Sequence, residues 1–424
     1  MLASHVCGRW RDVALSTPSL WNWFEFNGKG ASFERADAYL ERSGATDLFI
    51  CLDFRGECHS IDSEINKSFD LIVPEATRWA CLEAIIPGEK TMNIVLERLC
   101  MCEGAPKLRF LELLAPGYND ADFTATERGD SPKRLFSGNA PRLCEIYLRE
   151  VPLRWESDLA MFAGIESLTL DNHRFAYRPS YGHWIRLLSH AHNIRSLDVE
   201  NSGPNAMIRR DSRERTIILP NLGELRLAQM EPTAAVEIMH SLHAPWLKRL
   251  VLEPGENFNY KEFLHRALLN PPHCFSPLLR LKELVLGELA LTPDDVETLY
   301  CYSPVLEVLK IDLLSLETHF LTLINPSPKG NRGYYDHPLP ELKELFVIGA
   351  GGHFAALTAM VEHRRKLHHA RPLIISKIKK LVLCWQDVIR PMDAKRLKSC
   401  VKDVRILAGG NYEGGLRGRI NQLW

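Results

Sequence analysis

The sequence predicts an α/β solenoid, in which short parallel strands alternate with helices. Three observations lead to this prediction. One apolar motif recurs along most of the chain, a proline stands at the same place before many of its copies, and the stretches between copies show helical periodicity. A representative copy is Pro141-Arg-Leu-Cys-Glu-Ile-Tyr-Leu148, of the form Pro-x-Leu-x-x-Ile-x-Leu. A unit of this size cannot bury its apolar face alone, so we expect neighbouring units to stack.

The motif has the form L-x-x-L-x-L, with Ile or Val at some positions. The step between the last apolar positions of successive copies ranges from 22 residues (Leu148 to Leu170) to 36 residues (Ile311 to Val347). Such a period, built on this motif, is typical of leucine-rich repeats. The copies span residues 108–113, 143–148, 165–170, 194–199, 222–227, 247–252, 281–286, 306–311, 342–347, 378–383 and 401–406.

The repeats depart from the regular pattern at one position. Three residues after the last apolar residue, a regular repeat has Asn or Cys, whose side chain satisfies backbone groups. None of the copies has either residue there, and with the uneven steps this predicts an irregular solenoid. The residues found are Pro116, Val151, His173, Ser202, Met230, Gly255, Leu289, Leu314, Ala350 and Gln386.

Prolines and helical periodicity define the rest of each repeat. A proline cannot continue a helix and has no N–H for a sheet, so it fits between a helix and the start of a strand. Thr292-Pro-Asp-Asp295 predicts a helix start, because Thr caps, Pro fits the first turn and acids favour the helix dipole. Prolines two residues before a motif are Pro106, Pro141, Pro220, Pro245, Pro304 and Pro340. Apolar periodicity predicts helices over 89–102, 184–191, 235–242, 263–268 and 357–367.

The N-terminal stretch has a different pattern. Apolar residues at positions 2, 3, 6, 7 and 10 have helical spacing, and Pro18 ends that helix or starts a new turn. Leu20-Trp21 and Trp23-Phe24 form an aromatic cluster that requires a core. A short helix over 32–40 and a strand over 47–54 follow, and residues 79–86 predict a first degenerate repeat strand.

The stretch Val6-Cys-Gly-Arg-Trp-Arg-Asp-Val-Ala-Leu-Ser-Thr-Pro-Ser-Leu-Trp21 resembles the second half of an F-box. The form is the one common in mushroom-type (basidiomycete) fungi, roughly V-C-R-x-W-R-x-x-A-L-S-T-P-x-L-W. The main departure is Gly8, where the family usually has a basic residue. An F-box followed by irregular leucine-rich repeats is a well-known pairing, so the resemblance agrees with the repeat pattern.

The resemblance implies a partner. The family's F-box binds the Skp adaptor of cullin–RING ubiquitin ligases, and here Leu2, Val6, Cys7 and Trp10 would form the adaptor-binding face. The same four residues could instead be the core of the F-box. The first half of the motif, with its Leu-Pro start, has no counterpart in this chain. An upstream coding segment, or a loss of adaptor binding, would each account for this.

We predict four segments from these patterns. They are a partial F-box at 1–26, a transition with the first degenerate repeats at 27–104, the leucine-rich-repeat solenoid at 105–407 and a flexible C-terminal tail at 408–424. The turn-forming run Asn325–Pro340 predicts an exposed insertion within the solenoid.

The residue between the last two apolar positions of each motif should face the concave side of the sheet, because strand side chains alternate. Along the chain this row changes from mixed polar to rich in Val and Phe, and an exposed apolar patch usually marks a binding site. The alternative is that loops or the C-terminal tail cover the patch. The row contains Glu112 and Thr169, and its predicted partner-binding members are Tyr147, Asp198, Arg226, Val251, Val285, Lys310, Phe346, Val382 and Arg405.

Composition narrows the function classes. The 424 residues have a net charge of −1, which gives no reason to expect a nucleic acid partner, and no apolar run is long enough to span a membrane. Without a secretory signal at the start, the 11 cysteines predict reduced thiols in the cytoplasm or nucleus. No Walker loop, G-x-S-x-G, H-E-x-x-H or paired C-x-x-C is present, so we expect no enzyme activity, no cofactor and no metal.

The charge is uneven along the chain. From His353 onward there are 15 Lys and Arg but only 5 Asp and Glu. The clusters Arg364-Arg-Lys366 and Lys395-Arg396 could dock an acidic partner, or they could be solvated helix faces.

By resemblance, we expect a substrate-recognition subunit of a Skp–cullin–F-box ubiquitin ligase. It would contact the Skp adaptor and cullin scaffold, and it would hold an unidentified substrate protein on the solenoid without doing covalent chemistry. The alternative is a leucine-rich-repeat scaffold or interaction protein that has lost adaptor binding. A hydrolase or transferase is a third class, for which the sequence offers no site.

Overall fold

The computed structural model separates the chain into two compact units, Met1–Asp211 and Ser212–Trp424, which are described separately. Within them the structure describes residues 7–28, 32–56, 60–117, 134–153, 155–156, 159–205, 216–253, 255, 260–269, 276–287, 289, 291–312, 319–324, 338–348, 353–385 and 391–408. The predicted tail from residue 409 onward lies outside these ranges, as do residues 325–337 of the predicted insertion.

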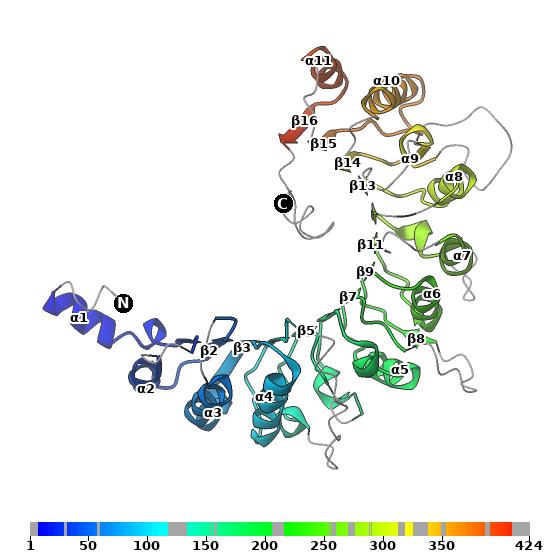
Figure 1. Ribbon diagram of the computed structural model, residues 1–424. Helices are drawn as coiled ribbons and strands as arrows, with labels where there is room; N and C mark the ends of the chain where they lie inside the picture. Colours follow the sequence, from blue (N-terminus) through cyan, green and yellow to red (C-terminus); the bar gives the residue numbers. More distant parts are fainter. Residues whose placement is uncertain are drawn as a thin grey trace. The chain divides into compact units, whose positions relative to one another are not determined.

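The described part of the first unit contains seven parallel strands, each paired with the next along the chain. All but the first of its described helices lie on one face of these strands (Figure 1). The strands are β1 Trp23–Phe26, β2 Leu48–Asp53, β3 Trp79–Ile85, β4 Phe110–Leu114, β5 Glu145–Arg149, β6 Ser167–Asp171 and β7 Ser196–Glu200. The helices are α1 Gly8–Leu15, α2 Ser32–Ser43, α3 Ile61–Ile72, α4 Glu89–Met101 and α5 Tyr181–His190, with 3-10 turns η2 Pro18–Leu20, η3 Val73–Arg78, η5 Leu135–Gly138, η6 Leu159–Phe162 and η7 Phe175–Tyr177.

The second unit has the same plan, with parallel strands in chain order and helices on one face (Figure 1). The strands are β9 Glu224–Ala228, β11 Arg249–Glu253, β12 Glu283–Leu286, β13 Val308–Asp312, β14 Glu344–Ile348, β15 Lys380–Trp385 and β16 Asp403–Ala408, with a small pair of β8 Ile217–Ile218 and β10 Leu242–His243. The helices are α6 Pro232–Ser241, α7 Lys261–Phe263, α8 Pro293–Cys301, α9 His319–Thr322, α10 Phe354–Ala370 and α11 Pro391–Cys400, with a π-helical turn η8 Leu264–Leu269 and a 3-10 turn η9 Pro277–Arg280.

The predicted leucine-rich solenoid is confirmed, because each of the eleven motifs coincides with a strand from β4 to β16. In β5, Leu143 lies just before the strand, Ile146 and Leu148 lie within it, and all three are buried. The intervening Tyr147 points to the opposite face. Burying one such apolar side chain contributes about 1.5–3 kcal/mol, so each copy of the motif contributes several kcal/mol to the core.

The helix predictions are also confirmed in outline. Thr292 caps α8: its side chain accepts from the Asp295 backbone N–H, and the Asp295 carboxylate accepts from the Thr292 backbone N–H. The helix predicted over 263–268 is correct in place, but part of it is the π-helical turn η8. β1 was not predicted as a strand, because the aromatic cluster that contains it hides the alternation of its buried Phe24 and Phe26.

Backbone hydrogen bonds close the repeats where regular ones use an Asn side chain. Two residues after the last apolar position, Glu150, Asn172 and Asn201 of the first unit adopt left-handed conformations with φ between 45° and 57°. The Glu150 and Asn172 backbone N–H groups donate to the strand of the next repeat, at 2.9 Å to Asp171 and 2.8 Å to Glu200. The irregular repeats therefore keep their stacking through the main chain.

Among the described residues of the first unit, Ser202 provides a side-chain substitute for the Asn of regular repeats. Ser202 Oγ accepts from the backbone N–H of His173 at 2.8 Å and lies 3.0 Å from His173 Nδ1. Both residues occupy the position where regular repeats have Asn, and both are buried. Burial, together with nearby Arg178, lowers the pKa of His173 to about 3, so the imidazole is neutral.

Candidate functional site

A group of exposed apolar side chains lies at the start of the first unit, in α1, η2 and β1. We call it the N-terminal surface. Trp10 is 57% exposed and Trp23 is 51% exposed, although large aromatic side chains usually lie in the core. A group of such side chains typically marks a contact surface. Its members are Trp10, Val13, Leu15, Leu20 and Trp23.

Trp21 anchors this surface to the solenoid. Its indole Nε1 donates to the Ala14 carbonyl at 2.6 Å, at the end of α1. The ring packs edge-on against Tyr39, with centroids 5.2 Å apart, and the guanidinium of Arg42 lies 4.6 Å from the ring centre. Because Tyr39 and Arg42 belong to α2, the N-terminal surface is held on the first unit.

Two of the four predicted adaptor-binding residues, Leu2 and Val6, lie outside the described residues. Cys7 and Trp10 are described, and both are exposed. The alternative that they form a core therefore does not apply to these two in this structure. Sequence reasoning missed Val13 and Leu20, although their spacing from Trp10 within a helix and turn was visible.

The second feature is the face of each sheet that points away from the helices, here called the open face. In the first unit, all its middle-row residues, one per strand, are exposed or half-buried. Predicted residues Tyr147 and Asp198 lie in this row, and the Tyr147 hydroxyl donates to Asp171 Oδ2 at 3.0 Å. The row is Glu25, Cys51, Glu83, Glu112, Tyr147, Thr169 and Asp198.

Acidic side chains set the electrostatics at the β1 end of this open face. Burial, and then the charges of Glu83 and its neighbours, raise the pKa of Cys51 to about 11. The same two causes raise the pKa of Cys81 to about 12. These thiols therefore stay protonated at neutral pH and are poor nucleophiles. Beside them, Trp23 and Phe49 stack with ring centroids 6.1 Å apart.

The open face of the second unit is different, because its apolar middle-row residues Val251, Val285, Phe346 and Val382 are all buried. Val251 and Val285 form a buried cluster that continues to Ile348 and Cys384 of neighbouring strands. Burial favours the alternative that the apolar part of the row is covered. Alternation along each strand was readable from the sequence, but this second layer of packing was not.

The charged predicted residues of this face are paired. Lys310 is buried, and its Nζ lies 2.6 Å from Glu283 Oε1 and 5.2 Å from the centre of the Phe346 ring. Burial lowers the pKa of Lys310. Arg226 forms an ion pair with Glu253 at 2.6 Å. Arg405, on β16, is the exposed member of the predicted set in this unit.

The basic C-terminal region is partly structural. Arg364 is buried in α10, and its guanidinium donates to main-chain carbonyls rather than to an acid. The interpretation of Arg364-Arg-Lys366 as a solvated or partner-binding cluster is therefore wrong for Arg364. Its acceptors are the carbonyls of Ser376 at 3.1 Å, Ile324 at 3.4 Å, Leu339 at 2.6 Å and Pro340 at 3.1 Å.

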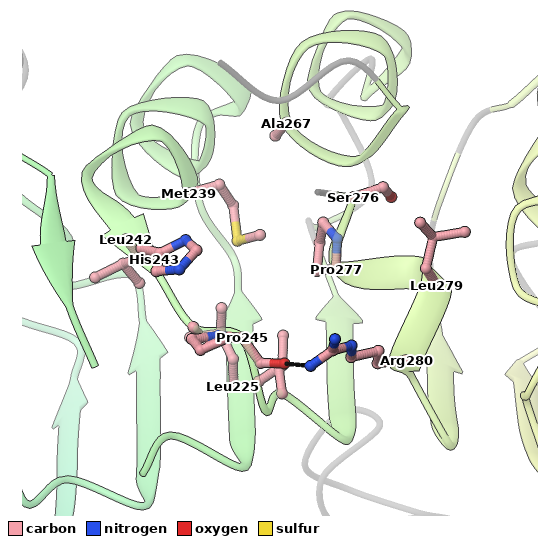
Figure 2. Close-up of a pocket in the computed structure, with 12 residues that line it drawn as sticks. Leu225, Met239, Leu242, His243, Pro245, Ala267, Ser276, Pro277, Leu279 and Arg280 are labelled. Carbon is pink, nitrogen blue, oxygen red and sulfur yellow. Dashed lines mark hydrogen bonds between the residues drawn. The ribbon is translucent and has the colours of Figure 1, made fainter. Parts of the chain in front are cut away.

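A pocket of about 410 Å³ lies within the second unit, among α6, η8 and η9 (Figure 2). Its lining is mainly apolar, and Arg280 donates to the Pro245 carbonyl at 3.3 Å at one side. The polar lining side chains are His243, Ser276 and Arg280, and the Ser276 hydroxyl donates to the Leu268 carbonyl. The lining contains no carboxylate and no thiol.

Within the described ranges, no group of His, Cys, Asp and Glu is arranged to hold a metal ion. The cysteines described there are free thiols. No described helix is long and apolar enough to cross a membrane.

Comparisons with known proteins give matches among solved structures alone. No family model matches the chain, and no curated protein matches its sequence. Among solved structures, the chain is similar to the leucine-rich repeat-containing protein LegL7 from Legionella pneumophila, at 13% identity and a TM-score of 0.33, covering 69% of this chain and 97% of that one. It is also similar to TLR13 in complex with ssRNA13, at 11% identity and a TM-score of 0.36, covering 91% of this chain and 44% of that one. It is similar as well to the Rad7 and Elc1 complex of yeast, at 16% identity and a TM-score of 0.31, covering 82% of this chain and 87% of that one. At these identities the likeness concerns the leucine-rich-repeat fold alone.

Proposed function

We propose that the protein is a substrate receptor of a Skp–cullin–F-box ubiquitin ligase. The N-terminal surface would bind the Skp adaptor, and the open face of the solenoid would hold the substrate protein. The observation that carries this proposal is the exposure of Trp10, Val13 and Leu20 on the segment whose sequence resembles an F-box.

Physical chemistry supports an interface at this surface. Exposed apolar side chains gain free energy when a partner removes them from water, at roughly 25 cal/mol per Å². Tryptophan is prominent among the residues that dominate binding energy at protein interfaces. Because Trp21 ties α1 to α2, a bound adaptor would be held at a fixed place on the first unit.

The proposed mechanism requires no covalent chemistry by this chain. A receptor that holds a substrate beside the ubiquitin-charged enzyme raises the effective concentration of the substrate's lysines. The alternative is a leucine-rich-repeat scaffold without a ligase. Such a scaffold would also bind its partners on the open face, but it would not bind the adaptor.

The test is a binding titration of the purified chain with the Skp adaptor. We expect saturable binding that W10A weakens about 30-fold, the usual effect of removing a dominant interface tryptophan. W246A is a matched control, because Trp246 is 58% exposed, close to the 57% of Trp10, and lies in the other unit.

Equal binding by wild type and W10A would place the adaptor elsewhere and contradict the proposal. If neither this chain nor a chain extended upstream in frame binds the adaptor, the result would favour the scaffold alternative.

A further inference from the structure

The two units differ in how the charged side chains on their open faces are paired. In the second unit, charged residues on neighbouring strands neutralise one another. Arg249 lies 3.3 Å from both Glu224 and Glu283, its direct neighbours in register on either side. Lys380 pairs in the same way with Glu344, at 3.4 Å.

The second unit also shows how this type of sheet holds a lysine. The Phe346 ring has two ammonium groups over it, Lys310 Nζ at 5.2 Å and Lys380 Nζ at 4.9 Å from its centre. Each lysine also forms an ion pair with a glutamate, Lys310 with Glu283 and Lys380 with Glu344. A ring and a carboxylate on adjacent strands thus form a site for one cationic side chain.

The first unit presents rings and carboxylates of the same kind, but without the lysines. Trp23 and Phe49 stack at the start of β1 and β2, and Glu25 follows two residues after Trp23. In register across the strands, Glu25 neighbours Cys51, and Cys51 neighbours Glu83. Among the residues that the structure describes, neither Glu25 nor Glu83 forms an ion pair, and Glu83 Oε1 accepts a hydrogen bond from the Cys81 thiol at 3.6 Å.

Acidic side chains continue across the strands of this open face. Glu83 is directly opposite Glu112 of β4 in the sheet register. Burial first, and then the charge of Glu83, raise the pKa values of Cys51 and Cys81. The carboxylates would attract a cationic side chain to this place on the open face.

We propose that the open face of the first unit, around Glu25, Glu83 and the ring pair Trp23–Phe49, binds lysine or arginine side chains of an extended basic segment in a partner protein. Strands β1 to β3 span about 10 Å, which about three residues of extended chain cross. Alternate residues of that segment would present their cations to the acids and rings. The proposal names the class of segment that the protein recognises. It rests on the proposed function only because both take the open face as the recognition surface.

The test is fluorescence anisotropy with a labelled peptide that alternates lysine and valine. A matched peptide with glutamine in place of lysine is the first control. We expect saturable binding of the lysine peptide alone, weakened as salt rises from 50 mM to 500 mM, since screening acts on such half-exposed pairs. The double variant E25Q/E83Q should bind about tenfold more weakly, the order expected for two partly exposed ion pairs.

The control variant is E41Q/E97Q, which removes the same charge from exposed positions on α2 and α4, on the helix side of the same unit. It should bind the lysine peptide as the wild type does. Equal weakening in both double variants, or binding of the glutamine peptide, would overturn the proposal by showing a non-specific charge effect or an apolar one.

W10A separates this proposal from the proposed function. It should leave peptide binding unchanged while it weakens adaptor binding. Loss of peptide binding in W10A, with the circular dichroism spectrum unchanged, would place the peptide on the N-terminal surface and contradict the assignment to the open face.

Discussion

The indole Nε1 of Trp21 donates a hydrogen bond of 2.6 Å to the carbonyl of Ala14, seven residues earlier. Trp79 makes the same bond to Ile72, also seven residues earlier, at 3.1 Å. In both places a helix ends, a 3-10 turn containing proline follows, and the tryptophan leads into a strand. The segment α1–η2–β1 is therefore built like a repeat of the solenoid, and its strand pairs with β2.

The change Trp21→Phe tests this anchor. Phenylalanine keeps a ring against Tyr39 but removes the indole donor to Ala14, whose carbonyl then keeps the longer bond of 3.3 Å from the Thr17 backbone N–H. We expect a loss of about 1 kcal/mol in the stability of α1, the usual net value of one hydrogen bond. Hydrogen exchange would show this as faster exchange of amides 11–16, with β4 to β7 unchanged. Unchanged protection of α1 would mean that the hydrogen bond does not hold the helix.

Sequence reasoning located the strands well because each motif carries its own local signal. The last two apolar residues of a copy face the core, so period-two alternation and the preceding proline both predict the same strand. β1 escaped this reasoning, because Trp23 is exposed and Phe24 is buried within one aromatic run. The local sequence does not show which of the two rings is buried. The pairing of β1 with β2 determines this.

The pair His173–Ser202 predicts an acid-sensitive step in stability. Burial lowers the pKa of His173 to about 3, whereas an unfolded histidine titrates near 6.5, so the unfolded chain binds more protons between these values. The contribution is complete above about pH 6.5 and is lost as pH falls. From pH 7 to pH 5 it amounts to about 2 kcal/mol.

The variant His173→Asn removes this titration while it keeps a side chain able to hydrogen-bond Ser202. Urea unfolding at pH 7 and pH 5 should show a smaller decrease in stability for the variant than for the wild type. An equal decrease would assign the acid sensitivity to other groups.

The open face was only partly predictable. Its rows follow from alternation, so Tyr147 and Asp198 were placed correctly on it from sequence alone. The burial of Val251 and Val285 depends on apolar neighbours in other repeats, such as Ile348, which lie far away in sequence. Lys310 was read as a surface charge, and its burial beside Glu283 and Phe346 again depends on neighbouring strands.

Arg364 predicts a strong contrast between neighbouring arginines. Replacing it with methionine in R364M keeps apolar volume but removes the donor to four carbonyls, among them those of Leu339 and Pro340. We expect the free energy of unfolding to fall by about 3 kcal/mol or more, because buried acceptors lose a charged donor. Chemical denaturation followed by circular dichroism measures this.

The adjacent residue supplies the control for R364M. Arg365 is exposed and donates one bond of 3.1 Å, to the Ser399 carbonyl. R365M should change stability by less than about 1 kcal/mol. Similar losses in both variants would mean that Arg364 contributes no more than a surface arginine.

The reactivity of the thiols depends on the negative electrostatic field that acidic side chains produce on the open face of the first unit. Burial and then Glu83 raise the pKa of Cys81 to about 12, so at pH 8 about one thiol in ten thousand is the reactive thiolate. The change Glu83→Gln removes a neighbouring charge, lowers that pKa and should accelerate alkylation of Cys81 by N-ethylmaleimide several-fold.

Cys102 is an internal control, because burial raises its pKa to about 11 with no acid contributing. Peptide-level mass spectrometry measures both rates in one sample. A Cys81 rate that does not change would mean that burial alone protects the thiol and that the negative field invoked for binding basic segments is weak.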